Sequence, residues 1–267
     1  MKRTRLVAAL VGLATCALAM TSISPASASP SEDDPALHWA GSQVVKHEGH
    51  GDGRAFAPAA LTNGLDVSHY QGNVDWSSVA AKGAKFAYVK ATEGTTYTDP
   101  TFAHQYNGSY NAGLIRGAYH FARPNASSGA AQADYFVAHG GGWSRDGKTL
   151  PPMLDIEYAP SGDTCYGLSQ ASMRSWIQSF VNEVKAKTSR YATIYTTTNW
   201  WTQCTGNWSG LGSTNPLFIA RYASSVGTLP AGWGFWTIWQ YADKGTFPGD
   251  QDYFNGAYDR VQALANG

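Results

Sequence analysis

Two carboxylates that lie two residues apart give the first sign of chemistry in this chain. Asp155 and Glu157 fall at the end of the apolar run 152–156. If this run is a β-strand, its side chains alternate between faces, so both carboxyl groups point the same way, about 6.6 Å apart along the strand. Like charges this close, partly desolvated by neighbouring rings, do not both ionise freely. One protonated and one ionised carboxyl suit acid catalysis at a glycosidic bond.

Other acidic residues occupy comparable positions. Asp66 lies within another short apolar run, and Asp250 and Asp252 lie near the last predicted strand. The turn-like segment 248–252 leaves an Asx-turn role open for the last two. The chain has no Gly-x-Ser-x-Gly elbow and no phosphate-binding glycine loop, which argues against serine-hydrolase and nucleotide chemistry. We therefore expect an acidic pocket assembled from several strand ends.

Apolar or β-branched runs alternate with helical stretches from residue 64 onward, which predicts parallel strands joined by helices. Eight such runs favour closure into an α/β barrel, whose active site forms at the carboxyl ends of the strands. After Thr196 the helical pattern becomes scarce. The predicted strands are 64–67, 86–91, 115–121, 152–156, 192–196, 217–221, 235–240 and a short one near Gln251, and the predicted helices are 76–82, 101–112, 130–139 and 169–187.

The N-terminal part divides the chain into three predicted regions. Residues 1–28 combine basic residues, an apolar run and a small-residue ending, which is typical of a secretory signal peptide. Residues 29–62 are polar and aperiodic, and we interpret them as a linker or pro-segment outside the barrel, with solvated histidines at positions 38, 47 and 50. Residues 63–267 form the predicted barrel. We expect a secreted, extracellular protein.

The charge balance argues against some binding partners, and the cysteine content predicts a disulfide. The chain has 19 basic and 19 acidic residues, so no overall field favours nucleic acid or an anionic membrane surface. Cys16 falls in the predicted signal peptide, which leaves Cys165 and Cys204 as a pair in an oxidising compartment. We predict that they form a disulfide, with free buried thiols as the alternative.

Several separated motifs resemble those of glycoside hydrolase family 25 lysozymes. They are GLDVSHYQG at 64–72, FAYVKATEG at 86–94, GAYHF at 117–121, LDIE at 154–157, IWQY at 238–241 and DQDYFNG at 250–256. The resemblance implies a single flattened, TIM-like (β/α)5(β)3 barrel. It also implies hydrolysis of the β-1,4 bond between N-acetylmuramic acid and N-acetylglucosamine in peptidoglycan.

The resemblance also assigns roles to the carboxylates. Glu157 is expected to be the general acid, and Asp155 to orient and stabilise the 2-acetamido group of the substrate if that group attacks the anomeric carbon. Asp66 and Asp250 would bound the same pocket, and Asp250 fits the last acidic position of the family better than Asp252. The carboxyl spacing leaves assisted retention and direct displacement by water both open.

Polar and aromatic residues near the strand ends are candidate substrate contacts, although packing inside the barrel is an alternative for the rings. Lys90 and Glu93 are expected to pair beneath the site. We expect no metal, no organic cofactor and a monomer. A chitin hydrolase and a non-catalytic carbohydrate-binding or inhibitor barrel are the alternative functions. The candidate substrate contacts are Tyr119, His120, Tyr195, Tyr222, Trp239, Gln240 and Glu93.

Overall fold

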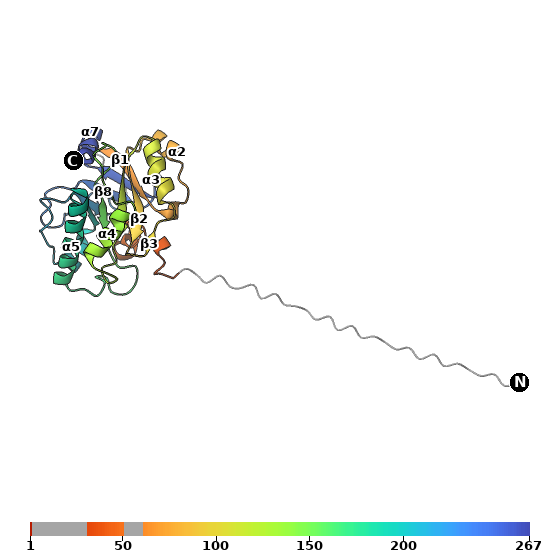
Figure 1. Cartoon of the computed structure of the whole chain (residues 1–267), viewed down its shortest axis with the longest axis horizontal. Helices are drawn as coiled ribbons and strands as arrows, with labels where there is room; N and C mark the ends of the chain where they lie inside the picture. Colours follow the sequence, from red (N-terminus) through yellow and green to blue (C-terminus); the bar gives the residue numbers. More distant parts are fainter. Residues whose placement is uncertain (2–30, 51–60) are drawn as a thin grey trace. The chain divides into compact units, whose positions relative to one another are not determined.

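The computed structural model describes Met1, residues 31–50 and residues 61–267 (Figure 1). The remainder of the predicted signal peptide, up to residue 28, lies outside the described residues, as does the stretch 51–60 of the predicted linker. Within the described part of the chain, no helix has the length and apolar character needed to cross a membrane.

Eight strands close into a barrel, as predicted. Around the barrel they run β1-β9-β8-β7-β6-β5-β4-β2, and β2 pairs with β1 to complete the circle. The short strand β3 (Tyr97–Thr98) pairs only with the end of β2. The barrel strands are β1 (Thr62–Val67), β2 (Phe86–Glu93), β4 (Ile115–Phe121), β5 (Met153–Asp155), β6 (Thr193–Thr196), β7 (Leu217–Ala220), β8 (Ile238–Ala242) and β9 (Asp250–Phe254).

The prediction of parallel strands is correct for seven of these strands and wrong for β9. Every neighbouring pair from β1 to β8 is parallel, whereas β9 is antiparallel to both β1 and β8. Only residues 243–249 connect β8 to β9, and a connection without a helix suits an antiparallel pair. A helix follows each of the first five barrel strands, in agreement with the expected (β/α)5(β)3 order.

The four predicted helices are present, and two further helices around the barrel were missed. The longest of them has Ser169 as its N-cap, and the Ser169 side chain accepts a hydrogen bond from the Ser172 N–H. The missed helices, α6 and α7, are short, and α6 is rich in threonine and tryptophan, which favour helices weakly. The helices around the barrel are α2 (Trp76–Ala81), α3 (Phe102–Asn111), α4 (Gly129–Ala138), α5 (Gln170–Thr188), α6 (Thr198–Thr205) and α7 (Tyr258–Asn266).

The helices cover the outer face of the barrel in two groups. In Figure 1, α2 and α3 lie on one side of the strands and α4 and α5 on the other. Phe136 of α4 and Phe180 of α5 pack in the same apolar layer as the outward side chains of β5 and β6. Inside the barrel, rings such as Phe86 and Phe218 fill the amino ends of the strands, where Val261 of α7 joins them.

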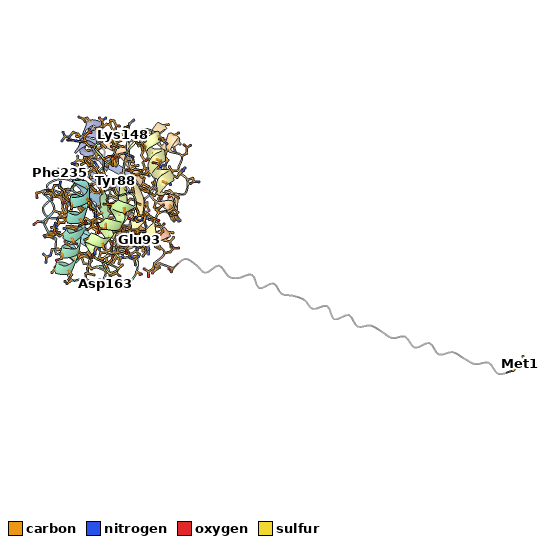
Figure 2. All side chains as sticks on the ribbon, viewed as in Figure 1. Met1, Tyr88, Glu93, Lys148, Asp163 and Phe235 are labelled. Atoms are coloured by element: carbon orange, nitrogen blue, oxygen red, sulfur yellow. A yellow bond between two sulfur atoms is a disulfide. The ribbon has the colours of Figure 1, made fainter. Side chains whose placement is uncertain are left out.

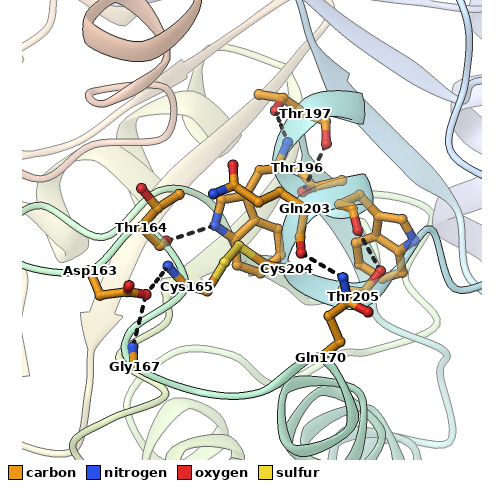
Figure 3. Close-up of a disulfide and its surroundings, with 12 residues drawn as sticks. Asp163, Thr164, Cys165, Gly167, Gln170, Thr196, Thr197, Gln203, Cys204 and Thr205 are labelled. Atoms are coloured by element: carbon orange, nitrogen blue, oxygen red, sulfur yellow. Dashed lines mark hydrogen bonds between the residues drawn. A yellow bond between two sulfur atoms is a disulfide. The ribbon is translucent and has the colours of Figure 1, made fainter.

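The predicted disulfide between Cys165 and Cys204 is present, with 5.3 Å between the two Cα atoms (Figure 3). It ties the loop that follows β5 to helix α6. Within this loop, the Asp163 side chain accepts hydrogen bonds from the N–H groups of Cys165 and Gly167. The bond therefore restrains the segment that continues from Glu157.

Residues 32–50, which we call the arm, correct two expectations. The arm contains the short helices η1 (Pro35–Leu37) and α1 (Val44–Glu48). It does not remain outside the barrel, because Ala40 and Val44 are buried together with the interior side chains of the strands. His38 is not solvated: it is 1% exposed and contacts Glu93 at the end of β2. His47 and His50 are exposed, as predicted.

Candidate active site

Four of the predicted acidic residues meet at the carboxyl end of the barrel. Asp66 is the next-to-last residue of β1, Asp155 ends β5, and Glu157 lies two residues beyond Asp155. Asp250 begins β9, and the antiparallel register places it opposite Asp66. Each carboxylate is at most 1% exposed. Because β9 runs antiparallel to the other barrel strands, its first residue lies at the level where those strands end, and residues from distant parts of the sequence converge there.

Gln240 of β8 links the acidic residues to two tyrosines. Its Nε2 donates to Asp66 Oδ2 at 2.8 Å and to Asp250 Oδ2 at 2.9 Å. Its Oε1 accepts from the hydroxyl groups of Tyr195, at 2.7 Å, and Tyr222, at 2.9 Å. These bonds fix the orientation of the amide, so Gln240 holds the two carboxylates in one place. The structure thus brings five of the predicted site residues into a single network.

Burial keeps the acidic groups protonated at higher pH than usual. It raises the pKa of Glu157 to about 8, against the lowering effect of hydrogen bonds from the backbone of Gly41 and Gln43. Burial, followed by the charge of Glu157, raises the pKa of Asp155 well above its usual range. Burial also raises the pKa of Asp66 to about 7, against the hydrogen bond from Gln240. Glu157 therefore holds a proton near neutral pH.

Asp250 and Asp252 both point into the barrel, but at different levels. Asp252 lies opposite Gly64 rather than Asp66, and no donor in the described residues bonds to its carboxyl oxygens. Burial raises the pKa of both aspartates well above the usual range, and the charge of Asp66 adds to the effect. Only Asp250 shares the Gln240 amide with Asp66. This geometry favours Asp250 as the fourth member of the cluster.

Lys90 and Glu93 form the expected pair beside the carboxylates. Lys90 Nζ lies 2.8 Å from Glu93 Oε2, and Arg123 donates to Glu93 Oε1 at 3.1 Å. Burial alone would raise the pKa of Glu93, but the charges of Lys90 and His38 outweigh it and hold the pKa below its usual value. Figure 2 labels Glu93 at the end of β2 and Tyr88, which comes from a deeper level of the same strand.

Two predicted substrate contacts, His120 and Trp239, do not line the pocket. His120 contacts Thr92 and Gln132 and packs against the rings under α4 and α5, where burial lowers its pKa to about 4. Trp239 donates to the Arg221 carbonyl on the outer face of β8. The physical reason is strand alternation: their neighbours Tyr119 and Gln240 point inward, so these two side chains point outward.

The arm contacts the site, although no residue pattern in the arm predicts these contacts. The Gly41 N–H donates to Glu157 Oε1 at 2.6 Å, and the Ala40 N–H donates to the Tyr119 hydroxyl at 3.2 Å. The Ala40 carbonyl accepts from Gln240 Nε2 at 2.9 Å. Both polar atoms of one peptide group are therefore bound by pocket side chains. The contacts use backbone atoms, which leave no residue-type signal in a sequence.

Other regions offer less chemistry. A cavity of about 330 Å³ lies between α7 and the loop before β7, lined partly by Trp233, Phe235 and Arg260, but no carboxylate lines it. In residues 31–50 and 61–267, no group of three or more His, Cys, Asp or Glu side chains is arranged to hold a metal ion. The carboxylate cluster is the site with the chemistry of a glycoside hydrolase.

Comparison with known proteins agrees with this class. The family model described as Glycosyl hydrolases family 25 matches residues 65–250, and the chain belongs to this family. Lysozyme M1 of Streptomyces globisporus is 48% identical over 276 residues, covering 97% of this chain and 94% of the relative. N,O-diacetylmuramidase of Chalaropsis sp is 50% identical over 208 residues, covering 76% and 99%. The crystal structure of the bacterial lysozyme from Streptomyces coelicolor superposes with a TM-score of 0.76 at 53% identity, covering 78% and 99%.

Proposed function

We propose that this chain is a muramidase, which hydrolyses the β-1,4 bond between N-acetylmuramic acid and N-acetylglucosamine in bacterial peptidoglycan. One observation carries the proposal: Glu157, a carboxyl with a pKa raised to about 8, lies in a cluster with Asp155, Asp66 and Asp250. The relatives named lysozyme and N,O-diacetylmuramidase support peptidoglycan as the substrate.

In this proposal Glu157 is the general acid. Its proton passes to the glycosidic oxygen as the bond from that oxygen to the anomeric carbon breaks. A water molecule supplies the hydroxyl group that ends on the anomeric carbon, either directly or after attack by the 2-acetamido oxygen, and its other proton returns to the carboxylates. Asp155 is buried beside Glu157, and no donor in the described residues bonds to its oxygens. It is therefore free to orient the 2-acetamido group, and its ionised form would stabilise positive charge at the anomeric carbon. Asp66 and Asp250, held by Gln240, complete the acidic wall.

An N-acetylated sugar fits the hydrogen-bonding groups of the pocket. The peptide group between Ala40 and Gly41 is a secondary amide, the functional group that an N-acetyl substituent carries. Gln240 binds its carbonyl, and Glu157 accepts from its N–H. Side chains that bind both polar atoms of one secondary amide suit a substrate that carries amide groups, although in the reaction itself Glu157 faces the glycosidic oxygen and Asp155 the acetamido group.

Secretion and the monomeric state are part of the same proposal. Residues 1–28 have the pattern of a secretory signal peptide. The disulfide between Cys165 and Cys204 suits an oxidising compartment outside the cytoplasm. We propose that the enzyme is exported and acts as a monomer on glycan strands of the cell wall.

The test is digestion of purified peptidoglycan, followed by identification of the new reducing ends. Because the arm covers Glu157, the wild-type chain is assayed beside a Gly41→Leu variant, whose added side chain displaces the arm. We expect N-acetylmuramic acid at the new ends. Reducing ends of N-acetylglucosamine would refute the bond assignment, and cleavage of chitin oligosaccharides in preference to peptidoglycan would favour the chitinase alternative.

The role of Glu157 is tested by Glu157→Gln in the more active of these two backgrounds. Glutamine keeps the size of the side chain but has no acidic proton to give. We expect kcat to fall by about 10²- to 10⁴-fold, the usual contribution of a general acid. Unchanged turnover would exclude Glu157 as the acid. Thermal unfolding of both proteins checks that the fold is retained.

A further inference from the structure

The arm occupies the mouth of the barrel at the carboxylate cluster. Gly41 binds Glu157, and Ala40 binds both Tyr119 and Gln240. With the arm in place, Glu157 is 0% exposed and Asp155 is 1% exposed. A polysaccharide cannot reach a carboxyl that has no accessible surface. In this arrangement the site is closed to its proposed substrate.

A second set of contacts anchors the part of the arm that precedes Ala40. Lys90 donates to the carbonyl groups of Pro35, at 3.0 Å, and His38. His38 Nδ1 lies 2.7 Å from Glu93 Oε1. The buried pair of Lys90 and Glu93 thus directs much of its hydrogen bonding toward the arm. Buried charges need such partners. When the arm leaves, Lys90 and Glu93 must replace its hydrogen bonds with bonds to water or to substrate.

The arm also reaches across the rim of the barrel. Trp39 stacks on Tyr70, with ring centroids 4.2 Å apart, on the β1 side. His47 stacks on Tyr158 at 4.0 Å, and Glu48 accepts from the Tyr158 hydroxyl at 2.7 Å, on the β5 side. These contacts lie on opposite sides of the cluster. The arm therefore crosses the cleft instead of touching one edge of it.

The closed sheet of the barrel is complete without the arm. All strand pairings of the closed sheet are made among β1 to β9, and the two apolar layers under the helices contain no arm residue. The arm adds only Ala40, Val44 and part of Val45 to the interior cluster. The lysozyme structure from Streptomyces coelicolor covers 78% of this chain and 99% of its own, a share close to that of the barrel without the arm.

Gly41 fits the cleft only because it has no side chain. A Cβ there would lie 2.3 Å from the Tyr222 hydroxyl, 2.6 Å from Gln240 Oε1 and 2.8 Å from the Tyr195 hydroxyl. Its φ of +91° also favours glycine. Gly49 has a similar positive φ of +74°, but no atom of residues 31–50 or 61–267 lies within 4 Å of a Cβ built on it.

We propose that the arm is an intramolecular inhibitor: residues 32–50 fill the substrate cleft, and the enzyme turns over peptidoglycan only when the arm has left it. This inference rests on the proposed muramidase function. The observed rate then scales with the fraction of molecules in which the arm is released. The barrel is the active unit, and the arm competes with the substrate for Glu157, Gln240 and Tyr119.

The test compares wild type, Gly41→Leu and the matched control Gly49→Leu, each as the full chain, in the peptidoglycan digestion. Both variants place leucine at a positive φ, but only Gly41→Leu introduces a clash with the pocket. We expect kcat/KM of Gly41→Leu to rise at least about tenfold above both other proteins, equivalent to about 1.4 kcal/mol. Hydrogen exchange at residue 41 should accelerate in the same variant and remain slow at Gly41 in the control.

A synthetic peptide with the sequence of residues 32–50 provides a second measurement. Added to Gly41→Leu, it should restore inhibition competitively with peptidoglycan, and the same peptide carrying leucine for Gly41 should not. Equal activity of the three full-length proteins, together with no effect of the peptide, would overturn the inhibitory role and leave the muramidase assignment intact. Inactivity of all three proteins at every pH would refute the muramidase assignment and the inhibitory role together.

Discussion

Both ends of the barrel are closed, but by segments of different chemistry. At the amino ends of the strands, α7 places Val261 and Ala265 in an apolar cluster with Phe86 and Phe218. At the carboxyl ends, the arm places the backbone of Ala40 and its neighbours against carboxylates, an amide and a lysine. One closure removes apolar surface from water. The other also buries Ala40 and Val44, but its contacts with the carboxylates, the amide and the lysine are hydrogen bonds that replace hydrogen bonds with water.

This difference separates a structural closure from a reversible one. Apolar burial contributes roughly 25 cal/mol for each Å² removed from water. Water does not compensate for this contribution when the apolar surface is exposed again. A hydrogen bond contributes only about 0.5–1.5 kcal/mol net, because water replaces the partner when the bond breaks. The amino-end closure by α7 therefore belongs to the fold. The carboxyl-end closure can open while the barrel stays folded, and a substrate rich in hydroxyl and amide groups can replace its bonds.

The same substitution at the two ends should give opposite results, and we expect the largest effect here. Val261→Asp places a carboxylate in an apolar cluster with no partner, at a cost of several kcal/mol, about 2–7 on the scale for an unpaired buried polar group. Thermal denaturation should show a strongly lowered Tm or no folded protein. Val44→Asp should release the arm, with a Tm close to that of Gly41→Leu and a raised kcat/KM on peptidoglycan.

Val44 and Val261 make a matched pair, because both valines are at most 1% exposed and both join the interior cluster. If Val44→Asp unfolded the chain as Val261→Asp does, the arm would be part of the folding core and the comparison between the two ends would fail. If Val261→Asp kept the Tm of wild type, the apolar closure by α7 would contribute little to stability.

The buried carboxylates at the carboxyl ends of the strands should make the free energy of unfolding depend on pH, with an effect of intermediate size. Folding raises the pKa of Asp66 to about 7 and of Glu157 to about 8, so the folded state binds protons more tightly than the unfolded state. The stability contributed by these groups is full below their ordinary pKa near 4 and is lost as pH rises to about 8. Each titrating group changes the free energy of unfolding by up to about 1.4 kcal/mol per pH unit.

Urea denaturation of wild type and Gly41→Leu between pH 4 and pH 8 measures this slope. Release of the arm returns water to the carboxylates, so Gly41→Leu should show the shallower decline. Asp66→Asn removes one of the titrating groups and should also reduce the slope. A wild-type stability that rises over this range would contradict the assignment of raised pKa values to the cluster.

The residue patterns predicted the barrel and the acidic cluster because both depend on side-chain type and strand alternation. An apolar run that ends in two alternate carboxylates defines its inward face, and the prediction that Asp155 and Glu157 belong to one site needed no tertiary information. The prediction that His120 and Trp239 contact substrate was wrong because it used only their position at strand ends. It ignored that their neighbours Tyr119 and Gln240 point inward, which turns these two side chains outward. Docking of the arm was beyond prediction, since its main contacts are made by backbone groups that every residue carries.

The smallest effect should come from residues on the outer face of the same strands. Trp239→Phe removes the hydrogen bond to the Arg221 carbonyl and should lower the free energy of unfolding by about 1 kcal/mol. In the Gly41→Leu background, its kcat/KM on peptidoglycan should change by less than about threefold. Tyr195→Phe is the matched inward change: it removes one hydrogen bond to the Gln240 amide that holds Asp66 and Asp250, and kcat should fall about tenfold, or about 1.4 kcal/mol. Equal losses of kcat in the two variants would mean that the outer face of β8 and the inner face of β6 contribute alike to the site, which strand alternation does not allow.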